Sequence, residues 1–272
     1  MNSTPSVTPQ GARQTESAAG AAFEALSQAL RRRASVRQYA DKPVSEDLLR
    51  ELLALAARTQ TMGNLQLYSV VVTRDARRKA LLAPAHFNQP MVTQAPVVLT
   101  VCADFHRTTR WCEERQAHPG YANLLSFLNA ATDALLYTQT LSCLAETRGL
   151  GLCFLGTTIY QPDQIIDLLQ LPRLVMPVAT LTLGWPAETP AQSDRLEPAA
   201  FVHEETYHDY SAADIDRHYA YKEGLEDNRR FCTINHKATL AQVYTDVRYT
   251  REANEQMSAT LLRALRRQGF LD

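Results

Sequence analysis

The hydrophobic positions of this chain fall into two kinds of pattern, helical spacing and short β-branched runs. Three continuous apolar runs are typical of buried strands: "LYSVVVT" (67–73), "APVVLTVCAD" (95–104) and "VMPVATLTLGWP" (175–186). A shorter run, "LGLCFLG" (150–156), predicts a fourth strand. The chain is therefore expected to contain a sheet built from segments that are far apart in the sequence.

Helical spacing of apolar residues lies between these runs. Phe23, Leu26 and Leu30 predict one helix, and a second begins after Pro43 with Ser45 as its N-cap. Short helices are expected over 75–82 and 161–172. A long one is expected over 120–148, which has no proline or internal glycine and is closed by Gly149. Strands and helices together indicate an α+β fold.

The two ends of the chain differ from this middle part. Residues 1–20 are rich in Ser, Thr, Pro and Gly and predict a disordered tail before a core domain over 21–190. Residues 191–272 begin without periodicity, and the stretches 212–222 and 236–268 look helical and highly charged. We expect this extension to lack a core of its own and to pack, as an arm, on the domain or on a second subunit.

Composition excludes several classes of protein. The 272 residues are 45% hydrophobic and 21% charged, enough for a substantial core, and the net charge of −1 argues against a nucleic-acid or anionic-membrane partner. No run approaches ~18 apolar residues, so no membrane-spanning helix is expected. The five cysteines are widely spaced without a CxxC, which favours a reducing, cytoplasmic setting, with Cys102 and Cys153 as buried hydrophobes.

Several common catalytic patterns are missing from the sequence. The seven histidines show no metal-ligand spacing, and we expect most of them at the surface. No GxSxG occurs, and the "GLGLCFLG" glycines follow a helix and open a strand, the reverse of the dinucleotide-binding order. Neither a metal site, a hydrolase nucleophile nor a Rossmann site is therefore predicted.

The stretch "RRRASVRQYADKPVSEDLL" concentrates four arginines within seven positions. Arg31 and Arg32 come at the end of a predicted helix, where cations are favourable. Arg33, Ser35 and Arg37 alternate, so in an extended segment they share one face, and two guanidinium groups with a hydroxyl suit a phosphate. From the residues alone, a solvated helix end and a phosphate site both remain open.

An ordered set of segments resembles the FMN-dependent nitroreductase family, specifically its NADPH-dependent oxygen-insensitive nitroreductase and NADPH–flavin oxidoreductase branch. The resemblance runs from about residue 30 to residue 231. The segments that carry it are "RRASVRQYADKPVSEDLLRELLALA", "RTQTMGNLQLYSVVV", "NQPMVTQAPVVLTVCADFHR", "LGLGLCFLGTTIYQPDQIIDLLQLPRLVMPVATLTLGWPAETP" and "DNRRF".

The resemblance implies an architecture and a reaction. Family members are three-layer α+β homodimers with a mixed or antiparallel central sheet flanked by helices, FMN between the subunits, and terminal extensions that wrap the partner. This chain would then take hydride from NADPH, with NADH as the second candidate donor, and pass it to a nitroaromatic, quinone or flavin acceptor in a ping-pong scheme. A flavin enzyme of the same superfamily with dehydrogenase, dehalogenase or flavin-fragmenting chemistry is the alternative.

The resemblance also implies which residues bind the cofactors, since the chemistry is centred on the flavin and needs no protein nucleophile. Arg33, Ala34 (through its backbone), Ser35 and Arg195 would contact the phosphate side of FMN, and Arg37 the N1/O2 edge of its ring. The remaining FMN contacts would come from Thr61, Met62, Asn64, Gln89, Leu155, Gly156 and Thr157. Arg229 and Arg230 would bind the NADPH 2′-phosphate.

This sequence departs from the pattern at a few of these positions. Ala34 and Ser193 stand where basic residues are common, and Met62 and Gly63 replace serines. The phosphate site is thus less basic than in the relatives, and the loop that shapes the open face of the flavin differs.

Overall fold

The structure is a computed structural model that describes residues 9–272, with side chains described from residue 19 onward. The first eight residues of the predicted disordered tail lie outside the described residues. From Pro9 the chain is helical, so the first helix begins well before the predicted boundary at residue 21.

The chain divides into two compact units, residues 1–192 with 260–272 and residues 193–259, and each is described by itself. The first unit contains α1 (Pro9–Arg32), α2 (Glu46–Ala56), η1 (Met62–Asn64), β1 (Tyr68–Thr73), α3 (Ala76–Leu82), η2 (Ala83–His86), α4 (Pro90–Gln94), β2 (Val97–Asp104), α5 (His106–Glu114), α6 (Leu124–Thr147), β3 (Gly151–Leu155), η3 (Gly156–Ile159), α7 (Pro162–Leu169) and β4 (Val175–Gly184). The second contains η4 (Pro198–Ala200), α8 (Ala212–Gly224), α9 (Glu226–Ile234), α10 (Leu240–Val243), the π-helical turn η5 (Tyr244–Arg248) and the first part of α11 (Arg251–Arg267).

The four strands form one antiparallel sheet in the order β1-β2-β4-β3. All four lie where the apolar runs predicted them. β2 and β4 occupy the centre and are buried at every position, as expected of strands that are covered on both faces. The predicted α+β class is confirmed, and the sheet is antiparallel throughout.

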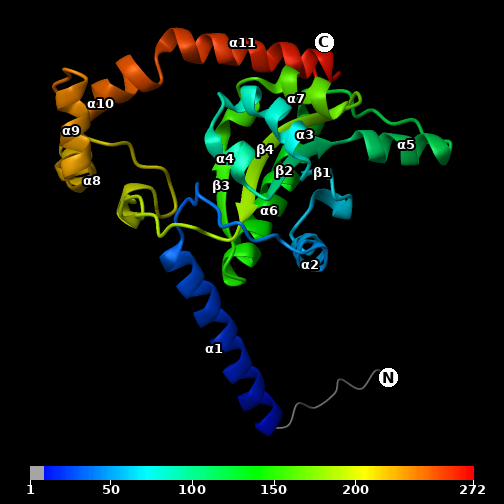
Figure 1. Cartoon of the computed structure of the whole chain (residues 1–272), viewed down its shortest axis with the longest axis horizontal. Coiled ribbons are helices and arrows are strands. Elements are labelled where there is room, and N and C mark those ends of the chain that lie inside the picture. Colours follow the sequence, from blue (N-terminus) through cyan, green and yellow to red (C-terminus); the bar gives the residue numbers. More distant parts are fainter. Residues whose placement is uncertain (1–8) are drawn as a thin grey trace. The chain divides into compact units, whose positions relative to one another are not determined.

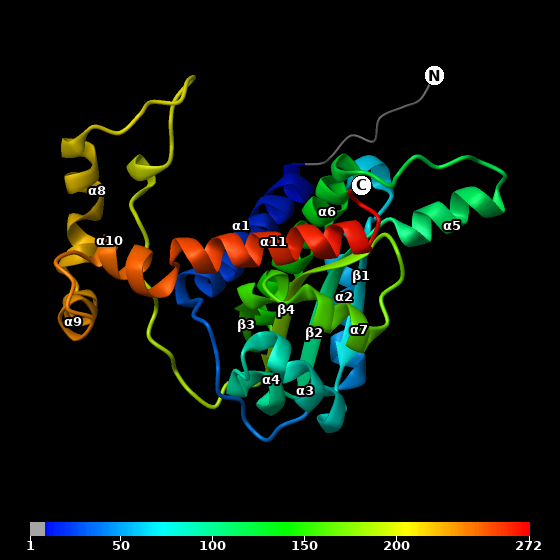
Figure 2. The same cartoon turned by 90° about the horizontal axis from the view of Figure 1, so that it is seen from above.

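Helices cover both faces of this sheet (Figures 1 and 2). On one face α6 crosses β2 and β4 and packs beside α2, and the odd-numbered β2 residues Val97, Leu99 and Val101 point into this layer. On the other face α3, α4 and α7 enclose a second apolar cluster that includes Val98 and Ile165. The result is a three-layer arrangement in which strand alternation sends successive side chains to opposite cores.

Local signals fix most helix ends in this unit. The Ser45 hydroxyl accepts the Leu48 N–H at 3.2 Å and caps α2, as predicted. Gly149 adopts φ +78° just after α6, the left-handed conformation that a helix-ending glycine supplies. α6 itself begins four residues later than predicted, where the Asn123 side chain accepts the Ser126 N–H at 2.9 Å.

The C-terminal extension is divided between the two units. Within residues 193–259 the buried apolar side chains are Ala200, Leu240 and Val243, so this unit has little core, as expected. The predicted helix over 236–268 is broken by η5 and the residues around Tyr249. The end of α11 and the residues after it belong to the first unit, where Leu265 and Phe270 are buried in the main core.

Candidate functional site

The basic segment that follows α1 runs in an extended conformation beside β3. The Val36 N–H donates to the Leu152 carbonyl at 3.1 Å. On the opposite edge, the Glu188 carboxylate accepts the Arg37 and Gln38 N–H groups at 2.6 and 3.0 Å. The main-chain N–H groups of the segment are therefore held by a carbonyl on one side and a carboxylate on the other, which leaves its side chains free to face a ligand.

Side chains along this segment divide as the alternation predicted. Val36 is buried against Gly151. Arg33 is half-buried and Arg37 is exposed. Burial raises the pKa of the Cys153 thiol on β3, and the nearby guanidinium groups of Arg37 and Arg33 partly offset that rise. Both arginines thus lie close enough to Cys153 to affect its thiol, but they line different hollows, Arg33 beside Gly149 and Arg37 beside Met91. Arg31 and Arg32 are exposed at the end of α1.

The tyrosine of the same segment anchors it to the sheet. The Tyr39 hydroxyl donates to the Val36 carbonyl at 2.8 Å and lies 2.6 Å from the Thr182 hydroxyl on β4. Burial is the main cause of the raised pKa of Tyr39, so the phenol stays protonated and can keep donating. The basic segment is consequently fixed relative to the sheet at both of its ends.

A buried histidine joins two other predicted site segments. His86 Nδ1 lies 2.8 Å from the hydroxyl of Thr157, in η3 directly after β3. The His86 carbonyl accepts the N–H of Gln89 at 3.2 Å, at the start of α4. The structure therefore brings Gln89 and the Leu155–Thr157 segment together at the end of β3, the strand that also carries the basic segment.

His86 is an exception to the expectation that most of the histidines lie at the surface. Its side chain is fully buried, and burial lowers its pKa to about 4. The ring is therefore neutral at physiological pH. Its Nε2 atom is buried and has no hydrogen-bond partner among the described residues. No motif marks this residue, so sequence reasoning did not select it.

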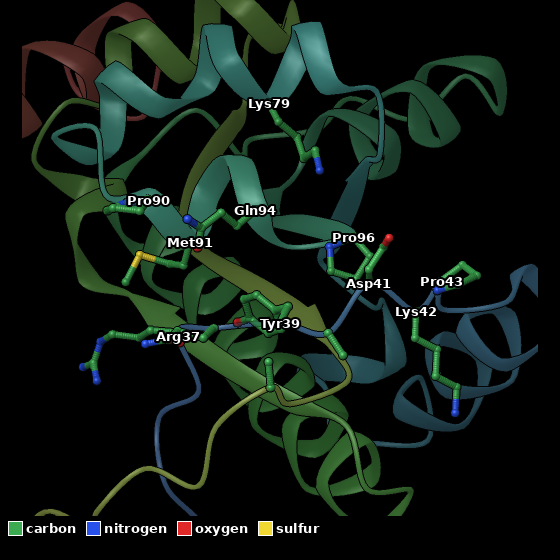
Figure 3. A pocket seen from close by; sticks show the side chains of 13 residues that line it. Arg37, Tyr39, Asp41, Lys42, Pro43, Lys79, Pro90, Met91, Gln94 and Pro96 are labelled. Atoms are coloured by element: carbon green, nitrogen blue, oxygen red, sulfur yellow. The ribbon is translucent and has the colours of Figure 1, made fainter.

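An open groove of about 930 Å³ lies between the Arg37–Pro43 segment and the helices α3 and α4 (Figure 3). Pro90 and Met91, directly after Gln89, line it together with the buried Lys79, whose ammonium donates to the Ala95 carbonyl at 2.6 Å. Burial lowers the pKa of Lys79, and Asp75 partly opposes this. Arg37 lines one side of the groove, and the other side is partly apolar and carries the Lys79 ammonium.

The loop that is predicted to contact the flavin contains Thr61, Met62 and Asn64, and its hydrogen bonds lie away from the end of β3. Met62 and Asn64 are exposed. The hydrogen bonds of this loop go to Asp133 on α6 and Arg107 on α5, not to the end of β3. The resemblance assigns this loop to the cofactor site of the other subunit, and that role stays a prediction.

Three predicted arginines belong to the second unit. The Arg195 guanidinium donates to the Asp194 carbonyl at 2.7 Å and lines a cavity of about 240 Å³ with Lys222, which pairs with Asp194 at 2.8 Å. Arg229 and Arg230 are exposed on α9. Their parts in cofactor binding stay predictions.

The residues gathered at β3 fit a phosphate-bearing flavin. Arg33, Ser35 and Arg37 provide two cations and a hydroxyl on one segment, and Gln89 adds an amide. A Cβ atom built on Gly156 would meet no protein atom within 4 Å, so a flat ring can approach this backbone closely. Among the side chains that the structure describes, from residue 19 onward, no group of acidic, histidine or cysteine residues is arranged to hold a metal ion. No helix within residues 9–272 is long and apolar enough to cross a bilayer.

Comparison with known proteins agrees with this geometry. The sequence model described as "Nitroreductase family" matches residues 30–185. The chain is 34% identical to an FMN reductase [NAD(P)H] of Bacillus subtilis over 64% of this chain and 70% of the relative. It is 32% identical to an oxygen-insensitive NADPH nitroreductase of Salmonella typhimurium, with 64% and 70% covered. A crystal structure from Bacteroides fragilis, 58% identical, superposes with a TM-score of 0.89 over 90% of this chain and 100% of that one.

Proposed function

We propose that this chain, which belongs to the nitroreductase family, is an FMN-dependent NAD(P)H oxidoreductase that reduces nitroaromatics, quinones or flavins. The observation that supports the proposal is the basic segment with Arg33, Ser35 and Arg37, which is hydrogen-bonded to β3, the strand that leads into the open backbone of Gly156. The names of the relatives, an FMN reductase and an NADPH nitroreductase, support the same reaction. A reducing cytoplasm is the setting that the free cysteines favour.

Each part of the site has a role that follows from its chemistry. Arg33 and Ser35 would hold the phosphate, with the backbone of Ala34 as a donor, and the resemblance assigns Arg195 to the same phosphate. Arg37 would contact the electron-rich edge of the ring, where a fixed cation stabilises negative charge. Gln89 would hydrogen-bond the ring, and the Leu155–Thr157 backbone would lie beside it. FMN, when bound, supplies the two-electron hydride exchange between nicotinamide and acceptor.

The nucleotide donor is assigned to the second unit. Arg229 and Arg230 are exposed, adjacent and on one helix, which suits the dianionic 2′-phosphate that distinguishes NADPH from NADH. We expect Arg229→Ala to lower the NADPH preference in kcat/KM by about tenfold or more. Arg251→Ala removes an equally exposed charge from α11 and serves as the control. An unchanged NADPH/NADH ratio in Arg229→Ala would remove the role assigned to Arg229.

A homodimer is part of the proposal. α6 packs one face on the sheet, yet Leu124, Leu125, Leu128, Leu135 and Leu136 on its other faces are 39–69% exposed. On α1, Phe23, Leu26 and Leu30 are exposed as well. A helix that is apolar on all sides needs cover on all sides, and a second copy of this chain supplies it. Light scattering after gel filtration would measure the mass, and a monomer at micromolar concentration would contradict this part.

The test of the function compares two arginines of the same basic stretch. Purified protein should carry about one FMN per chain and oxidise NADPH with nitro or quinone acceptors in ping-pong kinetics. Arg37→Ala should weaken FMN binding by about tenfold to a hundredfold, because a charge-assisted contact is lost. Arg31→Ala removes the same charge at the solvated helix end and should leave binding unchanged.

Two results would count against the proposal. Protein that is colourless and cannot be reconstituted with FMN would refute flavin dependence. FMN-bound protein that is reduced negligibly by NADPH in stopped-flow measurements would instead favour another chemistry of the same superfamily.

A further inference from the structure

A buried carboxylate on the central helix α6 accepts hydrogen bonds from the loop that contains η1 and leads into β1. Asp133 is fully buried in α6, a helix whose other inward-facing residues are mostly apolar or make hydrogen bonds within the helix. One of its oxygens accepts the Met62 N–H at 2.8 Å, and the other accepts the Leu67 N–H at 3.0 Å. Both oxygens are thus directed at main-chain donors that lie at the two ends of the same short loop.

The loop between these two donors has an unusual backbone. Gly63, Asn64 and Gln66 adopt φ values of +55°, +57° and +48°. This left-handed region is natural for glycine but strained for the other two, so the conformation persists only where neighbouring groups determine it. The Gln66 amide donates to the Asn64 carbonyl and to its side-chain oxygen, both at 2.6 Å, which adds only a local brace.

Two side chains outside the loop support it. Asp133 accepts the N–H groups of Met62 and Leu67, and the Arg107 guanidinium of α5 donates to the Gln66 carbonyl. A main-chain bond adds to them, since the Asp104 N–H donates to the Leu67 carbonyl at 2.9 Å. The Arg107 side chain is exposed, whereas Asp133 is enclosed in the core. A carboxylate is required at position 133 because it accepts two hydrogen bonds, whereas an amide would turn its NH₂ group toward one of the two N–H donors.

We propose that Asp133 is the positioning residue that holds Thr61, Met62 and Asn64 in the shape that meets the flavin. This role rests on the proposed function, since it assumes that the loop contacts FMN. This role gives a reason for a buried carboxylate in a largely apolar helix, although its burial costs desolvation free energy. It also gives a reason why the strained loop adopts a single conformation. It also makes α6 the element that connects the core to the open face of the cofactor.

The test substitutes Asp133→Asn and compares it with Ser142→Ala. Ser142 is a buried polar residue on the same helix whose hydroxyl donates only to the Thr138 carbonyl at 2.8 Å, so its loss should not reach the loop. Amide hydrogen exchange of the peptide covering residues 59–70 is measured in FMN-free protein. FMN affinity is measured by quenching of flavin fluorescence. We expect Asp133→Asn to speed exchange at Met62 and Leu67 by about tenfold or more, and to weaken FMN binding by a similar factor.

The exchange rate and the FMN affinity test separate steps of the proposal. Loop exchange equal to that of Ser142→Ala would refute the positioning role. A loosened loop with unchanged FMN affinity would refute its connection to the flavin. Wild-type protein that binds no FMN would refute the proposed function and the flavin role with it, while the exchange result would still stand.

A second variant covers the case in which Asp133→Asn does not fold. Arg107→Ala removes the other support from an exposed side chain and leaves the core intact. It should speed exchange between residues 64 and 68 and weaken FMN binding by about threefold or more. If neither quantity changed, the loop would not depend on these supports and the proposal would be overturned.

Discussion

Gly151, the first residue of β3, is predicted to be the tightest packing point under the cofactor segment. An added Cβ would lie 2.5, 2.7 and 2.8 Å from Cγ2, Cβ and Cγ1 of Val36, its three side-chain carbons. Carbon atoms pack at about 3.5–4.0 Å, so Gly151→Ala must push the Arg33–Arg37 segment away by about 1 Å. Val36 N–H also donates to the neighbouring Leu152 carbonyl, so this shift strains a main-chain hydrogen bond as well.

The magnitude follows from overpacking. Forcing one extra methyl into a filled site costs about 1–3 kcal/mol, which lowers the melting temperature of a chain of this size by ~2–4 °C per kcal/mol. Ser35 and Arg37 flank Val36, so FMN binding should weaken by about tenfold or more when the segment moves. Urea unfolding of FMN-free protein gives the first quantity, and fluorescence titration gives the second.

Two controls separate this clash from a general effect of replacing glycine. Gly120→Ala places a Cβ in open space, with no atom within 4 Å. Val36→Ala removes two of the three crowded carbons, so it should partly restore FMN binding in the Gly151→Ala background. The reasoning is refuted if Gly151→Ala unfolds within about 0.5 kcal/mol of Gly120→Ala and binds FMN as tightly.

Three further predictions concern stability. Burial lowers the pKa of His86 from 6.5 to about 4, so between these values the unfolded chain binds a proton that the folded chain does not. Stability should fall by up to ~1.4 kcal/mol per pH unit as the pH drops through this window, and His86→Gln should flatten the decline in urea titrations at each pH. Gln268→Leu removes the amide donor to the Pro172 carbonyl at 2.8 Å and should cost about 1–3 kcal/mol in urea unfolding, whereas a cost below ~0.5 kcal/mol would contradict its role. Ser45→Ala loses the cap of α2 and should cost about 1 kcal/mol by the same assay while FMN affinity stays constant; an unchanged unfolding midpoint would show that the cap contributes nothing.

Local sequence patterns predicted the elements whose extent depends on nearby residues alone. The four strands are apolar runs, and the Ser45 cap and Gly149 are signals that act within a few residues. α5 escaped prediction because its sequence, "HRTTRWCEE", is polar with a single exposed tryptophan. The early start of α1 escaped because Ser, Thr and Gly favour disorder over helix in isolation.

The site was predictable in part for the same reason. Arg33, Ser35 and Arg37 alternate in sequence, so strand-like alternation alone predicts that they share a face. His86 and Asp133 make hydrogen bonds to partners 71 and 66 to 71 residues away, and neither is distinguished by its neighbours in sequence. Because burial depends on the tertiary structure, only the folded chain shows which histidine and which aspartate are buried beside the predicted site segments.

Because residues 260–272 rejoin the first unit, the second unit is an insertion with both of its ends fixed, rather than a tail. Doubling the length of such a closed segment costs only about 0.6 kcal/mol in loop entropy, so residues 193–259 can be lengthened, shortened or exchanged with little effect on the sheet. The segment around Arg37 that we propose to hold the flavin belongs to the fixed scaffold, while Arg195, Arg229 and Arg230 belong to the insertion. Under the proposed function, exchanging the insertion would therefore change the donor-binding arginines and the phosphate contact of Arg195 together, and would leave the Arg33–Arg37 segment in place.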